Sequence, residues 1–350
     1  MKAIIKDKKK YKLIKIPEGL SLNDCETERR TGSTGVATER FGHKWFITPR
    51  GKVIFKTYDI NEDGLRIVNE LLYDELAKQI GLPVAKYIPA QYKSYPLSYI
   101  LRVDKDEIPK PEPLRTHYGL ASVNVTGKNE SIYTGEELLD YDDFFGLETF
   151  VDYMQALDNF KEGEGYYVDK RNIKSQLYKM MVLDSLTFME DRHCMNVIFL
   201  KNDKDGYLVA APVIDNEMCF AGKYLWFKDY GEYKNLNLTK FMAAHGNEMC
   251  MYVNNDVKHA PREKRYEENV KALVKLSDKS KNMREFLDKT LETIDIDKAF
   301  ENVEKMGYKV SIAYKNFVKN LMLISTDTFK KHIMQSTEQK QTETKDELTK

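Results

Sequence analysis

The stretch DRHCMN (residues 191–196) lies between two apolar segments, MVLDSLTF before it and VIFL after it. Polar groups between buried segments cost free energy unless each one has a partner or a function. Phosphoryl transfer from ATP needs a carboxylate that receives a hydroxyl proton and hard oxygen ligands for Mg²⁺. A kinase catalytic loop supplies an Asp, an Asn five residues later, and a second Asp further on. Asp191 and Asn196 have this spacing, and Asp215 follows in APVIDNEMCF.

This spacing predicts a catalytic loop with Asp191 as the base and with Asn196 and Asp215 as Mg²⁺ ligands. His193 belongs to the predicted catalytic loop, but it lies too close in sequence to Asp191 to be taken automatically as its catalytic partner. We favour a role in which it hydrogen-bonds the loop backbone and fixes Asp191. Arg192 is expected either to face solvent or to pair with a nearby acid. An Asp-x-His sequence after a helix can also be an ordinary cap or turn, but three matched positions around a predicted hairpin favour the kinase interpretation.

A kinase site also needs a backbone that approaches phosphate and a lysine that holds it. Lys56 ends the strand-like KVIFK, where Val53 and Phe55 share one face and Lys56 lies on the other. Between two candidate strands, the sequence RRTGSTGVATERFG predicts a phosphate-binding turn, although TGSTG is also compatible with a surface turn. The candidate residues of this turn are Gly32, Ser33, Thr34 and Gly35.

The lysine needs an acidic partner, and the predicted helix LRIVNELLYDELAKQI supplies Glu70, Asp74 and Glu75. We favour Glu70, while a solvated acidic face remains the alternative for each of the three. Leu101 and Val103 end the last predicted strand of this region, LSYILRV, where a hinge between two lobes would contact adenine.

Composition narrows the class of protein. Lys plus Arg and Asp plus Glu number 55 each, so no net field favours DNA or an anionic membrane. The sequence shows neither a membrane span nor the apolar core of a signal peptide. The cysteines lack the paired spacing of zinc sites or disulfide scaffolds, which indicates reduced thiols in a cytoplasmic protein.

The order of patterns predicts an α+β protein with two lobes. A small β-rich N-lobe with one helix covers residues 1–103, and KLIKI, HKWFIT, KVIFKTY and VAKYIPAQY are its other strand candidates. Residues 104–135 are predicted to be a connector or surface insertion. Residues 136–334 form a larger, mainly helical C-lobe that contains a hairpin around KNDKDGY, and residues 335–350 form a disordered tail.

The chain resembles the HipA-type serine/threonine kinases, bacterial relatives of the protein-kinase and phosphatidylinositol-kinase folds. The likeness lies in DRHCMNVIFL, APVIDNEMCF, NELLYDELAKQIGLPVA and VIFK, and it runs in order through about residues 30–330. It implies a two-lobed protein-kinase-like fold that binds ATP and Mg²⁺. It also implies Asp191 as base, Asn196 and Asp215 as metal ligands and Lys56 as the phosphate-holding lysine, with His193 matching the family's loop histidine.

The resemblance carries two further expectations. Members of the group can phosphorylate a serine of the glycine loop, which makes Ser33 and Thr34 candidates for autophosphorylation. Only about thirty residues precede that loop, so the chain is similar to a shorter, stand-alone form, and an antitoxin or a host protein stays open as a partner.

The function predicted from the sequence is therefore an ATP- and Mg²⁺-dependent protein serine/threonine kinase in the cytoplasm, or delivered to a host as an effector. Its protein substrate is not specified by any motif. Two alternatives stay open: a phosphoinositide or small-molecule kinase, because lipid kinases share the DRHxxN loop, and a catalytically silent kinase-fold binding module. No direct nucleic-acid partner is expected.

Overall fold

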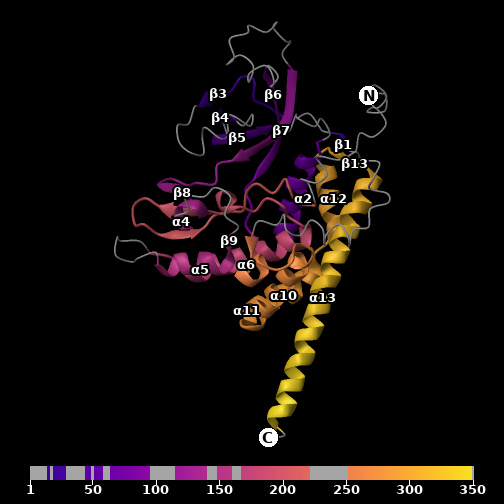
Figure 1. Ribbon diagram of the computed structural model, residues 1–350. Coiled ribbons are helices and arrows are strands. Elements are labelled where there is room, and N and C mark those ends of the chain that lie inside the picture. The colour runs from indigo at the N-terminus through magenta and orange to yellow at the C-terminus, as the bar shows by residue number, and fades with distance from the viewer. Residues whose placement is uncertain are drawn as a thin grey trace.

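A computed structural model describes residues 14–15, 19–28, 44–48, 51–57, 64–94, 115–139, 148–159, 167–220 and 251–348. Figure 1 shows a curled sheet at one end of the molecule and a mainly helical part at the other. The small β-rich part carries a single long helix, as the sequence predicts, so the α+β class and the two-part arrangement are confirmed.

The curled sheet has six strands in the order β2-β6-β7-β5-β4-β3. The predicted hairpin is present, because β4 and β5 pair antiparallel with Phe46 opposite Val53. The segment LSYILRV, predicted as a strand, lies outside the described residues. The strands of the sheet are β2 (Leu20–Ser21), β3 (Glu26–Glu28), β4 (Lys44–Thr48), β5 (Gly51–Thr57), β6 (Tyr87–Ser94) and β7 (Arg115–Val123).

The predicted connector is wrong in its second half. Residues 115–123, assigned to it from their sequence, form β7, which pairs with β5 on one side and with β6 on the other. Leu120 and Ala121 are fully buried on opposite faces of β7. A central strand that is covered on both faces does not need to alternate polar and apolar residues, which is why the sequence pattern of β7 is weak. Residues 130–134 form a further strand, β8 (Glu130–Thr134).

The predicted helix of the small part is α2 (Leu65–Gln79), and 12 of its 15 residues are buried. It follows Gly64, whose positive φ of 68° suits a residue without a side chain. Because most faces of α2 are covered, its acids cannot all be solvated, which makes their partners informative.

A second sheet, β11-β10-β8, lies between the curled sheet and the helices and contains the predicted hairpin. Its strands β10 (Ile198–Asn202) and β11 (Leu208–Ala210) pair antiparallel, with Phe199 opposite Ala210. Two short pairs complete the strands: β9 (Glu148–Thr149) with β12 (Met251–Tyr252), and β1 (Ile14–Lys15) with β13 (Lys309–Val310).

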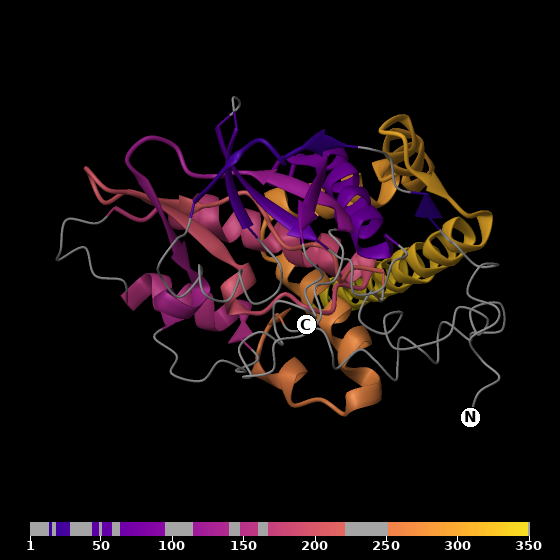
Figure 2. The same ribbon diagram turned by 90° about the horizontal axis from the view of Figure 1, so that it is seen from above.

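The helical part surrounds α6 (Lys170–Thr187), whose last turns are buried. Seen from above, α12 and α13 lie beside α2 at one edge of the curled sheet (Figure 2), and α12 packs directly on α2. None of the helices in the described ranges is both long and apolar enough to cross a bilayer. The remaining helices are α4 (Gly135–Leu139), α5 (Phe150–Asn159), α9 (Asn255–Lys258), α10 (Arg265–Asp278), α11 (Lys281–Thr293), α12 (Ile296–Lys305) and α13 (Ile312–Leu348), with short turns η4 (Cys194–Asn196) and η7 (Arg262–Lys264).

The predicted disordered tail is also wrong, because α13 continues to Leu348. Its polar residues include Glu, Gln and Lys and neither Pro nor Gly, a composition that tolerates a solvated helix. Ser336 and Lys340 both bond to Asp278 at the end of α10, which fixes the helix beyond residue 334.

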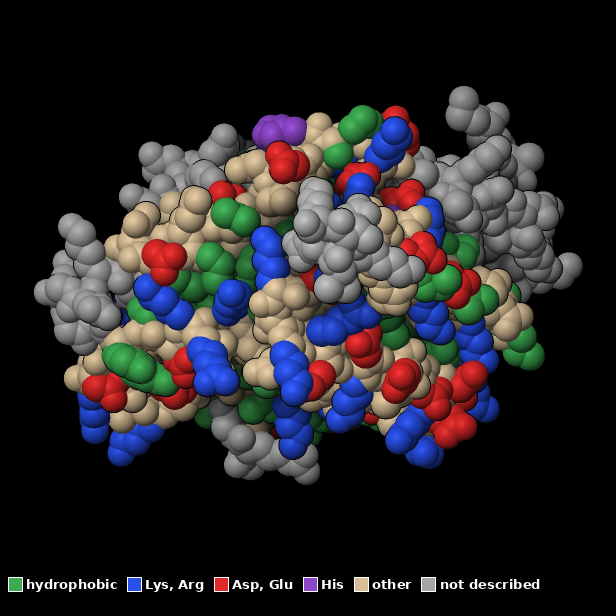
Figure 3. All heavy atoms as spheres, turned by 90° about the horizontal axis from the view of Figure 1, so that it is seen from below, with side chains coloured by type: hydrophobic (Ala, Val, Ile, Leu, Met, Phe, Trp, Pro, Cys, Tyr) green, Lys and Arg blue, Asp and Glu red, His purple; other side chains and the backbone are tan. Residues whose placement is uncertain are grey.

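On the face of the molecule seen from below, basic and acidic side chains are interspersed (Figure 3).

Two hydrophobic cores are separated by the curled sheet. The larger core joins α2, the second sheet and the helices into one cluster, and it includes Leu72, Leu183 and Leu321. The smaller core lies on the opposite face of the sheet and consists of Leu22, Phe46, Val53, Phe55, Ala90 and Ala121. The helix α2 therefore packs with the helical part as well as with its own sheet.

Candidate active site

The loop that follows α6 is held by its own polar side chains. Helix α6 ends at Phe188, whose positive φ of 51° turns the chain out of the helix. Asn196, in η4, donates from Nδ2 to the carbonyl of Asp191 at 2.8 Å, which closes the loop across five residues. This bond fixes the orientation of the amide, so Oδ1 is the atom of Asn196 that can ligate a cation.

His193 contacts the side chain of Asn196 rather than the loop backbone that we expected. Its Nε2 lies 3.2 Å from Nδ2 of Asn196. Because that amide nitrogen only donates, Nε2 of His193 is on the accepting side of this contact. Asp191 itself is partly exposed at the start of the loop.

Lys56 connects the curled sheet to the second predicted metal ligand. It is 6% exposed, and its ammonium forms an ion pair with Asp215 and lies 3.8 Å from Oε2 of Glu70. The ammonium also lies 5.7 Å from the ring centroid of Tyr87. Burial works to lower the pKa of Lys56, but the carboxylates of Asp215, Glu70 and Glu217 outweigh it and keep the pKa above its ordinary value.

Glu70 is the acid of α2 that faces Lys56, which is the partner we favoured. It is fully buried, and its Oε1 accepts from the backbone N–H of Asn216 at 2.9 Å. Glu75 instead bonds to Lys78 and to Asn302, both at 2.7 Å. Asp74 is buried, and its pKa lies well above the ordinary value, mainly because of burial and secondly because of repulsion from Glu70.

Asp215 adopts a left-handed backbone conformation with φ 56°. A residue other than glycine pays roughly 1–2 kcal/mol for this conformation, so surrounding contacts must hold it. Its backbone N–H donates to the hydroxyl of Tyr87 at 3.4 Å, and the bond from Asn216 to Glu70 fixes the next residue. The strained turn aims the Asp215 side chain at Lys56.

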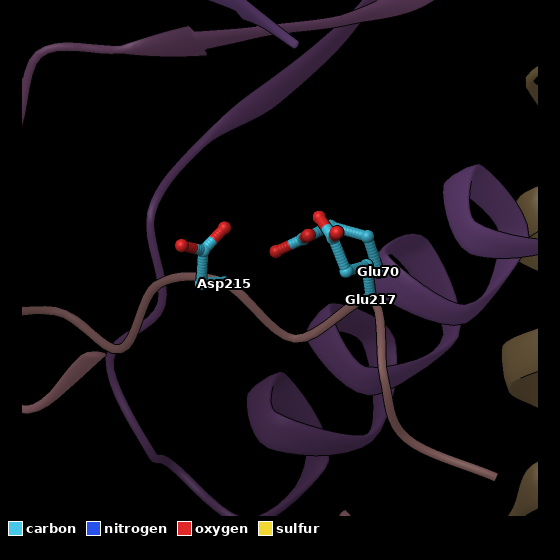
Figure 4. A group of neighbouring side chains, drawn as sticks. All are labelled: Glu70, Asp215 and Glu217. Atoms are coloured by element: carbon cyan, nitrogen blue, oxygen red, sulfur yellow. The ribbon is translucent and has the colours of Figure 1, made fainter. Parts of the chain in front are cut away.

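Glu217 belongs to the site and was missed by the sequence reasoning. Figure 4 shows Asp215 on one side and the carboxylates of Glu70 and Glu217 on the other. Oxygen atoms of the three lie within 4.8 Å of one another, and the Lys56 ammonium lies among them. Burial and the charge of Asp215 raise the pKa of Glu217 to about 7, even though Lys56 and Arg66 oppose this.

The donor set fits a hard cation such as Mg²⁺. Asp215, Glu70 and Glu217 offer carboxylate oxygens close to one another, and the buried Oε2 of Glu217 has no hydrogen-bond partner in the described part of the chain. The signal for Glu217 was the second acid in IDNEM, two residues beyond Asp215.

Arg192 is buried and ion-paired, which settles the two alternatives left open for it. Its guanidinium contacts both oxygens of Asp184, at 3.0 and 3.2 Å, and donates to the carbonyl of Ile214 and to Oδ1 of Asn216, each at 2.6 Å. The hydroxyl of Tyr73 donates to Asp184 at 2.7 Å. Arg192 thus joins α6, the loop and the Asp215 segment to α2. Asp184 within the apolar MVLDSLTF was the signal for a buried partner.

Several predicted site residues cannot be placed. The glycine-rich turn and the predicted hinge lie outside the described residues, so their contacts with the site are not part of the geometry above. These residues are Gly32, Ser33, Thr34, Gly35, Leu101 and Val103.

Neither a protein-family model nor a curated protein matches the sequence. Among solved structures, the chain is similar to the Helicobacter pylori proinflammatory kinase CtkA, with 13% identity, a TM-score of 0.49, and coverage of 91% of this chain and 100% of that one. The Golgi casein kinase gives 10% identity, a TM-score of 0.38, and coverage of 91% and 72%.

The HipA of Shewanella oneidensis MR-1, from a complex with HipB and operator DNA, gives 14% identity and a TM-score of 0.32. It covers 80% of this chain and 57% of that one. Kinases and a HipA protein are thus among the structures to which this chain is similar. At these identities and TM-scores, activity has to be inferred from the residues of the chain itself.

Proposed function

We propose that the chain is an ATP- and Mg²⁺-dependent phosphotransferase that phosphorylates serine or threonine hydroxyls of proteins. The observation that carries this proposal is the position of Lys56, which is buried, paired with Asp215 and 3.8 Å from Glu70. A lysine paired with a helix acid and next to a metal-binding Asp is the arrangement that phosphoryl transfer requires.

Each residue then has a defined task. Lys56 would contact the phosphates, and Glu70 would hold its ammonium in place. Asp191 would accept the proton of the attacking hydroxyl. Asp215 and Asn196 would hold Mg²⁺, with Glu217 beside them, and the bound ion would neutralise charge on the phosphate oxygens. The left-handed backbone conformation at Asp215 orients that ligand, and the hydrogen bond from the Asn196 side-chain amide to the carbonyl of Asp191 orients the other.

To test the proposal, the full chain is incubated with γ-labelled ATP and Mg²⁺. Parallel reactions contain a cell lysate, lipid vesicles with phosphoinositides, or small-molecule alcohols as substrates. Transfer to lysate proteins at Ser or Thr is expected. Asp191→Asn should lower the turnover by about 10²- to 10⁴-fold while ATP still binds, and Asp215→Asn should abolish the Mg²⁺-dependent rate. Asp327→Asn, an exposed acid of α13, is the matched control.

Label in lipid or in a small molecule alone would contradict the protein substrate. Unchanged turnover in Asp191→Asn would contradict catalysis by this loop and would favour a binding module. Phosphopeptide mapping of the same reaction tests autophosphorylation of Ser33 or Thr34, which the family resemblance suggests. The absence of phosphate on both residues would remove that part of the proposal.

A further inference from the structure

Asn69 lies at the centre of the contacts between α2, the Asp215 segment and α13. It is fully buried and precedes Glu70 in α2. Its Nδ2 donates to two backbone carbonyls, that of Glu217 at 3.2 Å and that of Cys219 at 2.8 Å. Its Oδ1 accepts from the hydroxyl of Tyr314. One side chain therefore bonds both to the turn after Asp215 and to the C-terminal helix.

Tyr314 is itself held rigidly in the first turn of α13. It is 2% exposed, and its backbone N–H donates to Oγ of Ser311 at 3.2 Å. Its ring stacks on that of Phe317, with centroids 6.2 Å apart and planes 22° apart. A hydroxyl carried by a fixed ring at a helix end can impose an orientation on the amide that it contacts.

Two more polar contacts fix α2 to the same C-terminal region. The side-chain amide of Gln79 donates to the carbonyl of Asp295 at 2.9 Å and accepts from its N–H at 2.7 Å. Nδ2 of Asn302 donates to Glu75 at 2.7 Å. Helix α2 therefore packs on α12 and shares the larger core with α12 and α13.

The segment after Asp215 has restraints besides Asn69. The backbone N–H of Asn216 donates to Glu70, and its Oδ1 accepts from Arg192. Arg66 pairs with Glu217 at 3.2 Å, and the N–H of Phe220 donates to the carbonyl of Thr187 at 2.6 Å. Between these contacts, the carbonyls of Glu217 and Cys219 are both bonded to Asn69. The amide of Asn69 thus holds the backbone at residues 217 and 219, shortly beyond the predicted metal ligand.

We propose that Tyr314 is a positioning residue, which acts through Asn69 to hold the Asp215 segment and Glu70 in the geometry that binds Mg²⁺ and Lys56. The inference rests on the proposed function for its kinetic consequence. It assigns to the start of α13 a task at the site, although none of the site residues named above lies in α13.

The test is Tyr314→Phe, which removes the hydroxyl and keeps the ring. Tyr308→Phe is the matched control, because Tyr308 is 1% exposed in the same region and its hydroxyl has no hydrogen-bond partner among the described residues. In Tyr314→Phe, Oδ1 of Asn69 loses its partner. We expect kcat to fall about tenfold and the Mg²⁺ concentration for half-maximal rate to rise about fivefold, while Tyr308→Phe stays within about twofold of the parent.

A purely structural role for the hydroxyl would lower the melting temperature but leave the Mg²⁺ dependence unchanged, and that result would overturn the proposal. Equal losses in both variants would overturn it as well. Hydrogen exchange at residues 216–220 provides a readout without catalysis, and we expect faster exchange in Tyr314→Phe alone. If exchange accelerates but the parent protein transfers no phosphate, the proposed function fails while the positioning role stands.

Discussion

At the scale of single residues, the ion pair of Arg192 and Asp184 is the contact with the largest expected consequence. The two side chains are 1% and 5% exposed. Burial works to lower the pKa of Arg192, but the charge of Asp184 outweighs it and raises the pKa. Each charge is therefore stable in the interior only because the other is present.

Removal of one partner should be far more harmful than removal of both. Arg192→Met leaves the buried carboxyl group of Asp184 without its cationic partner, with an expected cost on the order of 3–5 kcal/mol in the free energy of unfolding. Asp184→Leu likewise leaves the buried guanidinium of Arg192 without its anionic partner. The double variant should be closer to the parent than the sum of the single variants predicts, as measured by urea denaturation in a double-mutant cycle. Additive costs would show that the pair is not coupled.

The contrast between Lys56 and Arg192 shows what single residues reveal before a structure is available. Lys56 could be placed because alternation along a strand fixes its face, and the single helix limits its partners to three acids. Arg192 could not, because its partner Asp184 lies eight residues away, across the bend at Phe188 where no periodicity applies. Glu217 joins the site through a left-handed turn at Asp215, and a sequence pattern does not specify that turn.

At the scale of elements, the pairing of β5 with β7 depends on a missing side chain. A Cβ atom at Gly119 would lie 2.0 Å from the backbone oxygen of Lys56. The two strands can approach at this point only because residue 119 is a glycine.

Gly119→Ala should therefore displace β5 together with its lysine. We expect a loss on the order of 1–3 kcal/mol in the free energy of unfolding and an increase in the KM for ATP. Gly127→Ala is the control, because its Cβ would approach only the end of the Glu130 side chain, at 2.9 Å, which can move. Thermal unfolding and ATP titration measure both effects, and equal behaviour of the two variants would contradict the steric argument.

The distal part of α13 is held by acids of α10. Asp278 bonds to Ser336 and Lys340 of α13 and lies 3.0 Å from Arg284. Burial works to raise the pKa of Asp278, but the bonds from Lys340 and Ser336 outweigh it, so the pKa lies below the ordinary 3.8. These bonds explain why a predominantly polar segment forms a helix in contact with α10.

The depressed pKa of Asp278 fixes the sign of a pH effect. A carboxyl group with a lower pKa in the folded state stabilises the fold fully above the unfolded pKa, and this stabilisation is lost as the pH falls through the folded pKa. Hydrogen exchange at residues 335–343, corrected for intrinsic rates, should accelerate as the pH falls below about 4. Asp278→Asn should accelerate it already at pH 7, and Asp327→Asn should not. Equal protection in all three proteins would show that α13 does not depend on this contact.

At the scale of the whole molecule, the division into a β-rich and a helical part could be predicted, because the periods of 2 and 3.6 change along the chain. The central place of β7 could not, because β7 is buried on both faces and follows a long polar segment. Nor could the sequence show that α2 shares its core with α12 and α13, which begin more than 200 residues later. Contacts between distant segments carry no local signal.

The two cores lead to a prediction about cooperativity. The smaller core contains six fully or nearly buried side chains, and Phe46 lies in it with its ring 5.0 Å from that of Tyr92. The larger core continues from α2 through α6 to α13. A small cluster on one face of a sheet should open more easily than the large one, because less apolar surface becomes exposed.

Phe46→Leu should therefore accelerate hydrogen exchange in β4 and β5 and leave α6 and α10 unchanged, because it weakens only the smaller core. Leu183→Ala, in the buried last turns of α6, should cost about 2–5 kcal/mol and accelerate exchange throughout, since unfolding of the larger core removes the support of the sheet. Exchange measured by mass spectrometry on both variants distinguishes the two responses. If Phe46→Leu accelerated exchange equally in β5 and α6, the two cores would unfold as one unit, and Lys56 could not move independently of Asp191.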